Sequence, residues 1–195
     1  MIRVLISGCN GHMGQIVAQL CSENLDVEIA AGINRTPIQK NDFPVYSDPM
    51  EFPGEADVLI DFSNPANLTA LLRYCTEKKM PAVLCTTGYS AEQIREIEAA
   101  AQVVPMFRSG NMSLGINLLL ALVKKAAAVL GKDYDIEIVE RHHHRKVDAP
   151  SGTALMLADA AASQLPEGTE YVYDRQSVRR PRGKNEIGIY SVRGG

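Results

Sequence analysis

Residues 2–21 read IRVLISGCNGHMGQIVAQLC, and this stretch decides the fold. An apolar, partly β-branched run is followed by a turn rich in glycine and then by apolar residues at helical spacing, which predicts a strand, a tight turn and a helix. The turn, GCNGHMG at residues 8–14, has the form G-x-x-G-x-x-G, and only its last two glycines keep the usual spacing of dinucleotide-binding turns. We expect Asn10 to adopt a left-handed backbone conformation there, which asparagine tolerates. The stretch therefore predicts the first unit of a dinucleotide-binding domain.

Further strand candidates alternate with helices along the first half of the chain. The segment ADVLIDF at residues 56–62 is apolar on both faces, as buried parallel strands are. Asn64 with Pro65 is expected to begin the next helix, and Ser90 with Gln93 forms a capping box. The later strands are expected at residues 27–33, 56–62, 82–85 and 103–107, with helices after residue 64 and near residues 91–101. Five strands alternating with helices predict an α/β fold with a Rossmann-like, doubly wound parallel sheet.

The pattern changes at Ser113, where a second domain is expected to begin. Its expected elements are a long apolar helix at residues 114–130, a half-solvated strand at 135–140, a helix at about 153–165 and two weak strands within 171–192. We therefore divide the chain into a dinucleotide-binding domain, residues 1–112, and a smaller α+β domain for substrate binding and oligomerisation, residues 113–195. Because the chain stops at RGG directly after a strand-like run, we expect the second domain to be incomplete at its C-terminus.

The composition is that of an ordinary soluble globular protein, with 46% apolar residues, 22% charged residues and a formal net charge of -3. A small-molecule partner is therefore expected. The N-terminal sequence resembles neither a signal peptide nor a membrane span, which favours the cytoplasm. The four cysteines form no C-x-x-C pair and are expected to be reduced thiols. Nucleic-acid binding is the weakest alternative, and we expect a solvated loop for its basic residues Arg175, Arg179, Arg180, Arg182 and Lys184.

The glycine-rich turn has a physical requirement, because backbone N–H groups must approach a pyrophosphate at a helix N-terminus, where the macrodipole favours negative charge. The residue that reads the ribose is expected about 20 residues further on, at the end of the second strand. That position holds Asn34 and Arg35. A neutral side chain beside a guanidinium tolerates or attracts a 2′-phosphate, so the pair predicts NADPH, with NADH as the alternative. The competing interpretations are a merely structural turn at the glycines and a surface turn before Thr36-Pro37.

A second dense motif, ERHHHRKVD at residues 140–148, combines three consecutive histidines with three basic side chains. If the preceding strand continues through it, a period of two places His142 and His144 on one face and His143 on the other. A His-x-His pair on a strand suits zinc, but no further side chain completes the set at ligand spacing. We therefore expect no metal.

The same segment suits an acidic small substrate. Arg141, Arg145 and Lys146 supply positive charge, while Ser151, Thr153 and a helix N-terminus supply donors for a carboxylate. A histidine in such a pocket can take or deliver a proton near neutral pH, and a lysine can do the same. The alternative is a solvated basic edge.

Five motifs carry a resemblance to a known family. They are VLISGCNGHMG (4–14), DVLIDFSNP (57–65), CTTGYS (85–90), SGNMSLGIN (109–117) and, most specifically, IEIVERHHHRKVDAPSGTAL (136–155). With them the chain resembles bacterial 4-hydroxy-tetrahydrodipicolinate reductases, also called dihydrodipicolinate reductases, over essentially all 195 residues. The resemblance implies NAD(P)H-dependent reduction of dehydrated 4-hydroxy-tetrahydrodipicolinate to tetrahydrodipicolinate, in diaminopimelate and lysine biosynthesis. A hydride comes from the nicotinamide, and a proton is supplied alongside.

The resemblance also implies roles for individual residues. It assigns His142 and Lys146 as the catalytic pair that handles the proton, His143 as a substrate contact, and Gly152 with Thr153 as the cradle of a substrate carboxylate. The implied cofactor contacts are Gly8, Cys9, Asn10, Gly11, His12, Met13, Asn34, Arg35, Ser63, Cys85, Thr86, Thr87, Ser109, Gly110, Asn111 and Met112. Ser151 completes the expected substrate site. The implied assembly is a homotetramer formed through the second sheet.

Three departures from the family pattern bear on these expectations. Many members have an acidic residue where Asn34 stands, which predicts weaker use of NADH than of NADPH. Cys85 replaces a glycine, which adds a side chain where backbone approaches the cofactor. Family members also continue for several tens of residues beyond the RGG at 193–195. Two other hypotheses stay open, a different two-domain NAD(P)-dependent dehydrogenase and an inactive nucleotide-binding module.

Overall fold

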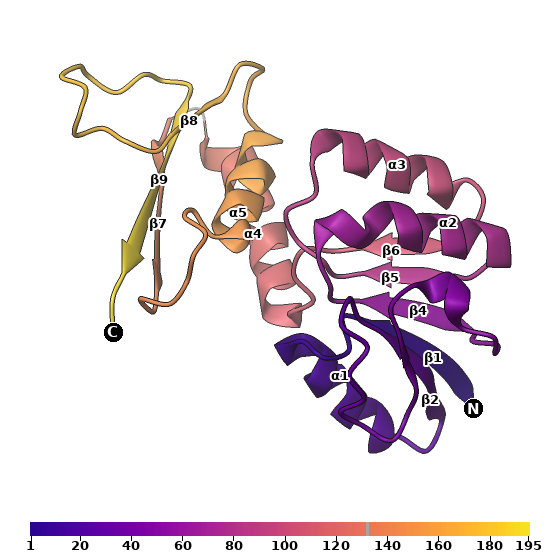
Figure 1. The fold of residues 1–195 in the computed structure, drawn as a ribbon. Coiled ribbons are helices and arrows are strands. Elements are labelled where there is room, and N and C mark those ends of the chain that lie inside the picture. The colour runs from indigo at the N-terminus through magenta and orange to yellow at the C-terminus, as the bar shows by residue number, and fades with distance from the viewer. Residues whose placement is uncertain (132) are drawn as a thin grey trace. The chain divides into compact units, whose positions relative to one another are not determined.

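The computed structural model describes residues 1–131 and 133–195, which fold into two compact units, Met1–Gly110 and Asn111–Gly195. Figure 1 shows that each unit consists of one sheet with helices packed against it. Each unit also has its own hydrophobic core, as expected of a domain.

The first unit is built on a parallel sheet of six strands in the order β3-β2-β1-β4-β5-β6. Its strands are β1 (Ile2–Ser7), β2 (Val27–Ile33), β3 (Val45–Tyr46), β4 (Val58–Asp61), β5 (Ala82–Leu84) and β6 (Met106–Arg108). Its helices are α1 (His12–Ser22), α2 (Leu68–Lys78) and α3 (Ala91–Ala101), with two short 3-10 helices, η1 (Pro49–Glu51) and η2 (Pro65–Asn67). The doubly wound parallel sheet predicted from the sequence is confirmed.

Besides the shorter bounds of β4 and β5 than the predicted 56–62 and 82–85, two details of this sheet differ from the prediction. The sheet has a sixth strand, β3, which pairs with the end of β2 over two residues. The last strand begins at Met106 rather than at Val103. The physical reason is that the N–H groups of Val103 and Val104 both donate to the carbonyl of Ala100 at the end of α3, so the chain is still turning there.

The strands of the first sheet bury side chains on both faces. Leu5 and Leu59 belong to one apolar cluster, which includes residues of α2 and α3. Their neighbours Val4 and Ile60 belong to a second cluster, which includes Ala18 of α1. Because successive side chains of a strand point to opposite faces, α1 covers one face of the sheet while α2 and α3 cover the other (Figure 1).

The predicted caps at Asn64 and Ser90 are present, but Asn64 caps the 3-10 helix η2, and α2 itself begins at Leu68 without a side-chain cap. The Asn64 side chain accepts the N–H of Ala66 at the start of η2. Ser90 and Gln93 form the expected capping box at α3, in which each side chain accepts the backbone N–H of the other residue. These caps satisfy N–H groups that the helices themselves leave without partners.

The second unit is a three-stranded parallel sheet in the order β7-β9-β8, with two helices on one face. Its elements are α4 (Leu114–Leu130), β7 (Ile136–His142), α5 (Gly152–Ala162), β8 (Glu170–Val172) and β9 (Glu186–Arg193). Ile187 and Ile189 of β9 are buried against Ala127 of α4 and Ala158 of α5. The strand predicted at 135–140 extends to His142, and the helix predicted at 153–165 ends three residues early, at Ala162.

The basic loop between β8 and β9 is ion-paired at Arg175 and Arg182, so the expectation of a solvated loop was wrong for these two residues. Arg182, only 18% exposed, pairs with Asp135 at 2.8 Å and with Glu137 at 2.9 Å. Arg175 pairs with Glu137 at 3.0 Å and with the buried Glu186 at 2.5 Å. These pairs attach the loop to β7 and β9.

The four cysteines are free thiols, as the sequence predicted. Among the described residues, no helix combines the length and the apolar character needed to cross a lipid bilayer.

Candidate functional site

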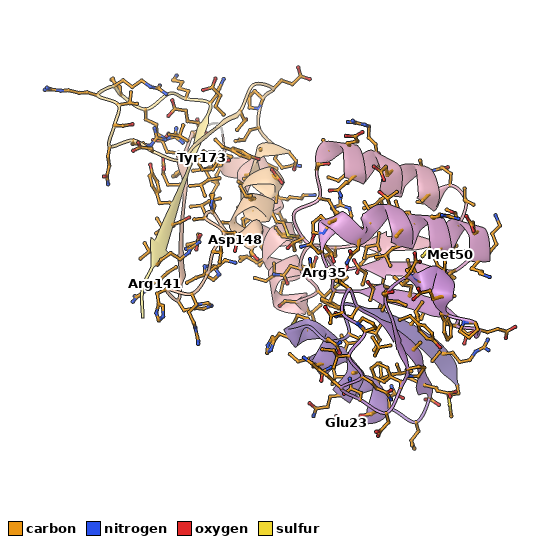
Figure 2. All side chains as sticks on the ribbon, in the orientation of Figure 1. Glu23, Arg35, Met50, Arg141, Asp148 and Tyr173 are labelled. Carbon is orange, nitrogen blue, oxygen red and sulfur yellow. The ribbon has the colours of Figure 1, made fainter. Side chains whose placement is uncertain are left out.

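A cleft of about 390 Å³ opens at the carboxyl ends of β1, β2 and β4 in the first unit. It lies beside the point where the strand order reverses, between β1 and β4, which is where open α/β sheets bind their ligands. Its lining residues are Gly8, Gly11, Asn34, Arg35, Thr36, Phe62, Ser63, Asn64, Ala66 and Asn67. The structure therefore brings five of the expected cofactor residues, from three separate segments, to one cleft, and Figure 2 shows Arg35 at this edge of the sheet.

Gly8 and Gly14 allow the glycine-rich turn to pack closely. Gly8 has a φ of +78°, and a Cβ placed there would lie 2.5 Å from the carbonyl oxygen of Phe62. A Cβ on Gly14 would lie 2.1 Å from the carbonyl oxygen of Gly8. Helix α1 then begins directly after Gly11, which has no side chain to cap it, so its first N–H groups are suited to an anion.

Asn10 does not take the left-handed conformation expected of it. Gly8 has the positive φ in this turn, and Lys79 is the one residue other than glycine with a positive φ in the described part of the chain. The Asn10 side chain instead donates to the carbonyl oxygens of Ile38, at 2.8 Å, and Thr36, at 3.3 Å. It therefore holds the loop that follows β2 against the glycine-rich turn.

Other expected cofactor residues of the first unit lie outside the lining of this cleft. Cys9 is completely buried, and Met13 is 42% exposed on α1. His12 lines a separate hollow beside α1, together with Lys40. Cys9, His12 and Met13 are therefore not among the residues that line the cleft.

Asp61, at the end of β4, is a buried carboxylate that was not predicted as a site residue from the sequence. It accepts hydrogen bonds from the Thr86 hydroxyl at 2.7 Å, the Ser63 N–H at 3.1 Å and the Tyr89 hydroxyl at 3.2 Å. Asp61 thus joins Ser63 of the cleft to the CTTG loop at residues 85–88. Its position as a polar residue ending an apolar strand was the signal available in the sequence.

The Cys85 side chain is turned into the protein. It is 8% exposed, and its Sγ lies 4.0 Å from the carbonyl oxygen of Val83. Burial, together with the charge of Asp61, raises the pKa of the thiol to about 11. Thr87, two residues on, is exposed, and the Ser109 N–H donates to the carbonyl oxygen of Leu84 at 3.1 Å.

In the second unit the histidine motif starts at the end of β7. The strand stops at His142, so the condition for an alternation of His142, His143 and His144, a strand that continues through them, is not met. The chain turns instead, with the Lys146 N–H donating to the carbonyl of His143 at 3.1 Å. His144 Nδ1 lies 2.6 Å from the carbonyl oxygen of Gly195.

Glu140 of β7 is the centre of a buried polar cluster. Its carboxylate lies 2.5 Å from Nδ1 of His142, accepts the Ser151 N–H at 3.0 Å and receives both guanidinium nitrogens of Arg193, at 2.8 and 2.9 Å. The Arg193 fork is the main cause that holds the pKa of Glu140 far below its usual range. Neither Glu140 nor Arg193 was predicted as a site residue.

Lys146 and the start of α5 lie close to a second carboxylate, Asp148, which Figure 2 labels between β7 and α5. Lys146 Nζ lies 2.8 Å from Oδ1 of Asp148. This pair, with the Gly152 N–H as a further donor, lowers the pKa of Asp148. The N–H at the start of α5 and the Lys146 ammonium therefore already interact with a carboxylate.

The start of α5 combines a buried cap with open space. The Ser151 side chain is buried and accepts the Ala154 N–H at 3.2 Å. Gly152 is exposed, with no heavy atom within 4 Å of an ideal Cβ. The Thr153 hydroxyl accepts a hydrogen bond from the Asn111 side chain at 3.0 Å. Among the described residues, no group of three or more His, Cys, Asp or Glu side chains is placed to hold a metal.

Two family models match the chain. Residues 2–112 match the model described as dihydrodipicolinate reductase, N-terminus, and residues 115–195 match the model described as dihydrodipicolinate reductase, C-terminus.

Curated relatives and solved structures give the same result. The chain is 49% identical to the 4-hydroxy-tetrahydrodipicolinate reductase of Clostridium tetani, covering 100% of this chain and 76% of that protein. It is 53% identical to the enzyme of that name from Caldanaerobacter subterraneus, with 100% and 77% covered. A dipicolinate-bound dihydrodipicolinate reductase from Paenisporosarcina sp. TG-14 superposes with a TM-score of 0.74 at 26% identity, covering 100% of this chain and 79% of that chain.

Proposed function

The chain belongs to the dihydrodipicolinate reductase family and catalyses its reduction step in diaminopimelate and lysine biosynthesis with a nicotinamide cofactor, and on this premise we propose which cofactor and which residues it uses. We propose that NADPH is the preferred reductant. When bound, it supplies the hydride. The supporting observation is the cleft at the switch point of the sheet, where Arg35 and the glycine-rich turn line one space.

The cleft fits a dinucleotide phosphate. Gly8 leaves no room for a side chain between the turn and the end of β4, and α1 begins without a side-chain cap. The ribose-reading position holds the neutral residue Asn34, so no carboxylate stands there to repel a 2′-phosphate. The Asn34 side-chain amide donates to the carbonyl oxygen of Thr36 at 2.9 Å. Arg35 beside it supplies a cation for that phosphate.

Arg35→Ala tests this preference. The change should weaken NADPH binding by about 1–3 kcal/mol, the size of a charge-assisted hydrogen bond, and should leave NADH binding nearly unchanged. Both dissociation constants are measured by fluorescence titration. Arg95→Ala, which removes the same charge from the exposed face of α3, is the matched control and should alter neither constant. An unchanged NADPH to NADH ratio in Arg35→Ala would contradict the proposal.

We assign the proton step to His142 and Lys146. Nδ1 of His142 faces Glu140, so Nε2 is the ring nitrogen left to exchange a proton with a substrate. Lys146 lies in the turn that leads to α5 and contributes positive charge beside Asp148. Gly152 and Thr153 at the start of α5, with Ser151 as cap and His143 nearby in the chain, form the proposed site for a substrate carboxylate, favoured by the helix dipole.

His142→Gln tests this assignment. Turnover should fall by roughly 100-fold or more, as expected for loss of a general acid, while the affinity for NADPH stays nearly unchanged. His144→Gln is the control, because His144 is an exposed neighbour that bonds to the backbone of Gly195. If His142→Gln weakened NADPH binding as much as it lowered turnover, the assignment of His142 to the proton step would be wrong.

The proposed assembly is a homotetramer formed through the second sheet. The helices α4 and α5 cover one face of this sheet, and Val139 and Val192 on the other face are 69% and 45% exposed. Sedimentation equilibrium measures the mass directly, and a monomer at micromolar concentration would contradict the tetramer.

A further inference from the structure

One buried carboxylate, Glu140, connects the histidine and the start of α5 in the second unit. We propose that Glu140 is a positioning residue, which fixes the tautomer of His142 and anchors the carboxylate cradle at Ser151. This inference rests on the proposed function, because it deepens the role of His142 in the proton step.

Three elements converge on Glu140. It lies two residues before His142 on β7, so both side chains are on the same face of the strand. Arg193 of β9 is the register partner of His142, and its guanidinium donates a hydrogen bond to each of the two carboxylate oxygens of Glu140. The third partner is the Ser151 N–H, directly before α5. Glu140 is only 9% exposed, so water does not compete strongly for these hydrogen bonds.

The charges around Glu140 keep it a hydrogen-bond acceptor. The groups that face it are the Arg193 guanidinium, the His142 ring and the Ser151 N–H, with the Ser191 hydroxyl of β9 as a further donor. Arg193 also donates to the carbonyl oxygen of Asp148 at 2.6 Å, in the turn that carries Lys146. A carboxylate paired with a guanidinium stays ionised near neutral pH, and an ionised carboxylate has acceptors only.

The consequence for His142 follows from this acceptor. Nδ1 must carry a hydrogen in order to bond to the carboxylate, so the neutral ring has its lone pair on Nε2. The protonated ring carries its transferable proton on Nε2. When that N–H bond breaks and the proton forms a bond to the substrate, the ring returns to the neutral Nδ1–H form, still bonded to Glu140. Without Glu140, the ring is free to populate the other tautomer and to rotate.

The first measurement is the ¹⁵N spectrum of histidine in the full chain, which reports which nitrogen of each neutral ring carries hydrogen. His142→Gln identifies the signal. The native protein should show the Nδ1–H tautomer for His142, and Glu140→Gln should convert it to a mixture. A native His142 that is mainly Nε2–H would overturn the proposal, and this result does not require Glu140→Gln to fold.

The second measurement is turnover. Glu140→Gln should lower kcat by about 10- to 100-fold, as expected when the partner of a reactive histidine is lost. Glu137→Gln is the matched control, because Glu137 is on the same strand, faces the other way and pairs with Arg175 and Arg182. It should keep the native tautomer of His142 and a kcat within about twofold of the native value, an allowance for small indirect effects.

A double variant separates this inference from the proposed function. If Glu140 acts on the proton step through His142, the kcat of Glu140→Gln combined with His142→Gln at saturating substrate should be no lower than that of His142→Gln alone. Loss of the anchor at Ser151 should instead raise KM. Losses of kcat that multiply in the double variant would overturn the inference. If His142→Gln alone leaves kcat unchanged, the proposed proton role of His142 fails, whereas the tautomer measurement still decides whether Glu140 fixes the ring.

Discussion

The geometry of Gly8 in the glycine-rich turn predicts how much stability the protein loses when this residue is replaced by alanine. This residue combines a positive φ of +78° with a backbone contact that leaves no room for a methyl group. A Cβ placed there would lie 2.5 Å from the Phe62 oxygen and 2.9 Å from the Cα of Ser63. Both contacts are to backbone at the end of β4, which cannot move aside as a flexible side chain can. Gly8→Ala should therefore destabilise the first unit strongly.

The size of the effect is the sum of two contributions. Placing alanine at a left-handed φ costs about 1–2 kcal/mol. Forcing a methyl group into closely packed surroundings costs a further 1–3 kcal/mol or so. Gly88 isolates the first contribution, because it has a similar φ of +82° and the nearest atom to its Cβ is Cγ of Pro65 at 3.9 Å, an ordinary contact. We expect Gly88→Ala to cost about 1–2 kcal/mol and Gly8→Ala about 2–5 kcal/mol.

Urea unfolding followed by circular dichroism measures the difference. With an m value of about 2 kcal/mol/M, the midpoint of Gly8→Ala should lie about 0.5–1.5 M below that of Gly88→Ala. Hydrogen exchange of the buried amides of β1 and β4 assigns the loss to the first unit rather than to the second. Equal midpoints for the two variants would refute the contribution of the clash, and a native-like midpoint for both would refute the cost of the positive φ as well.

Two further predictions concern buried carboxylates. Asp61→Asn should lower the free energy of unfolding of the first unit by about 1–3 kcal/mol, because the hydrogen bonds from Ser63, Thr86 and Tyr89 to a charged carboxylate are replaced by weaker ones to a neutral amide. A loss below about 0.5 kcal/mol by urea unfolding would contradict this. Arg175 and Arg180 lower the pKa of Glu186 from 4.5 to about 2, so Glu186 stabilises the fold fully above pH 4.5 and loses this effect as the pH falls toward 2. Glu186→Gln should thus be less stable than the native protein at pH 7, with the gap between their urea midpoints closing at pH 2; a gap independent of pH would be evidence against this pairing.

Local signals explain which helices could be predicted from the sequence. The helices expected at residues 91–101 and 114–130 are α3 and α4, with the same bounds. Each has a side-chain cap at its start, from Ser90 and Ser113 respectively. Helix α5 was predicted three residues too long, because after Ala162 the N–H groups of Gln164 and Leu165 turn back to carbonyls three residues earlier. Apolar periodicity does not distinguish such a final tight turn from a continuing helix.

Strands that depend on pairing were harder to predict. β3 consists of Val45 and Tyr46 alone, and its existence depends on the hydrogen bonds that it makes with the end of β2. Two residues are too few to show a period of two. The same limit applied to the histidine motif, where the turn after His142 ended the strand that periodicity would have continued.

In the candidate site too, residues that belong to a local motif could be predicted from the sequence, whereas residues brought together by strand pairing could not. The glycine-rich turn and Arg35 were found in the sequence because a dinucleotide-binding turn has a regular spacing. Arg193 was missed because it is 53 residues from Glu140 and reaches it only through the pairing of β7 with β9. A parallel pairing of this kind leaves no pattern in either segment alone, since it is set by how the strands pack under α4 and α5.

In each unit a buried carboxylate, Asp61 or Glu140, fixes a segment of the candidate site by accepting a backbone N–H from it. Each carboxylate is buried at or near the end of a strand, and each accepts a backbone N–H from the segment that follows in the site, Ser63 in one case and Ser151 in the other. A buried charge is costly unless it is well bonded, so the donors around it must stay in place. Asp61 is held by two hydroxyls and an N–H, whereas Glu140 also has a guanidinium fork. The fork leaves Glu140 ionised with an oxygen directed at His142, which is the arrangement that the proposed proton transfer by His142 requires and the proposed cofactor loop does not.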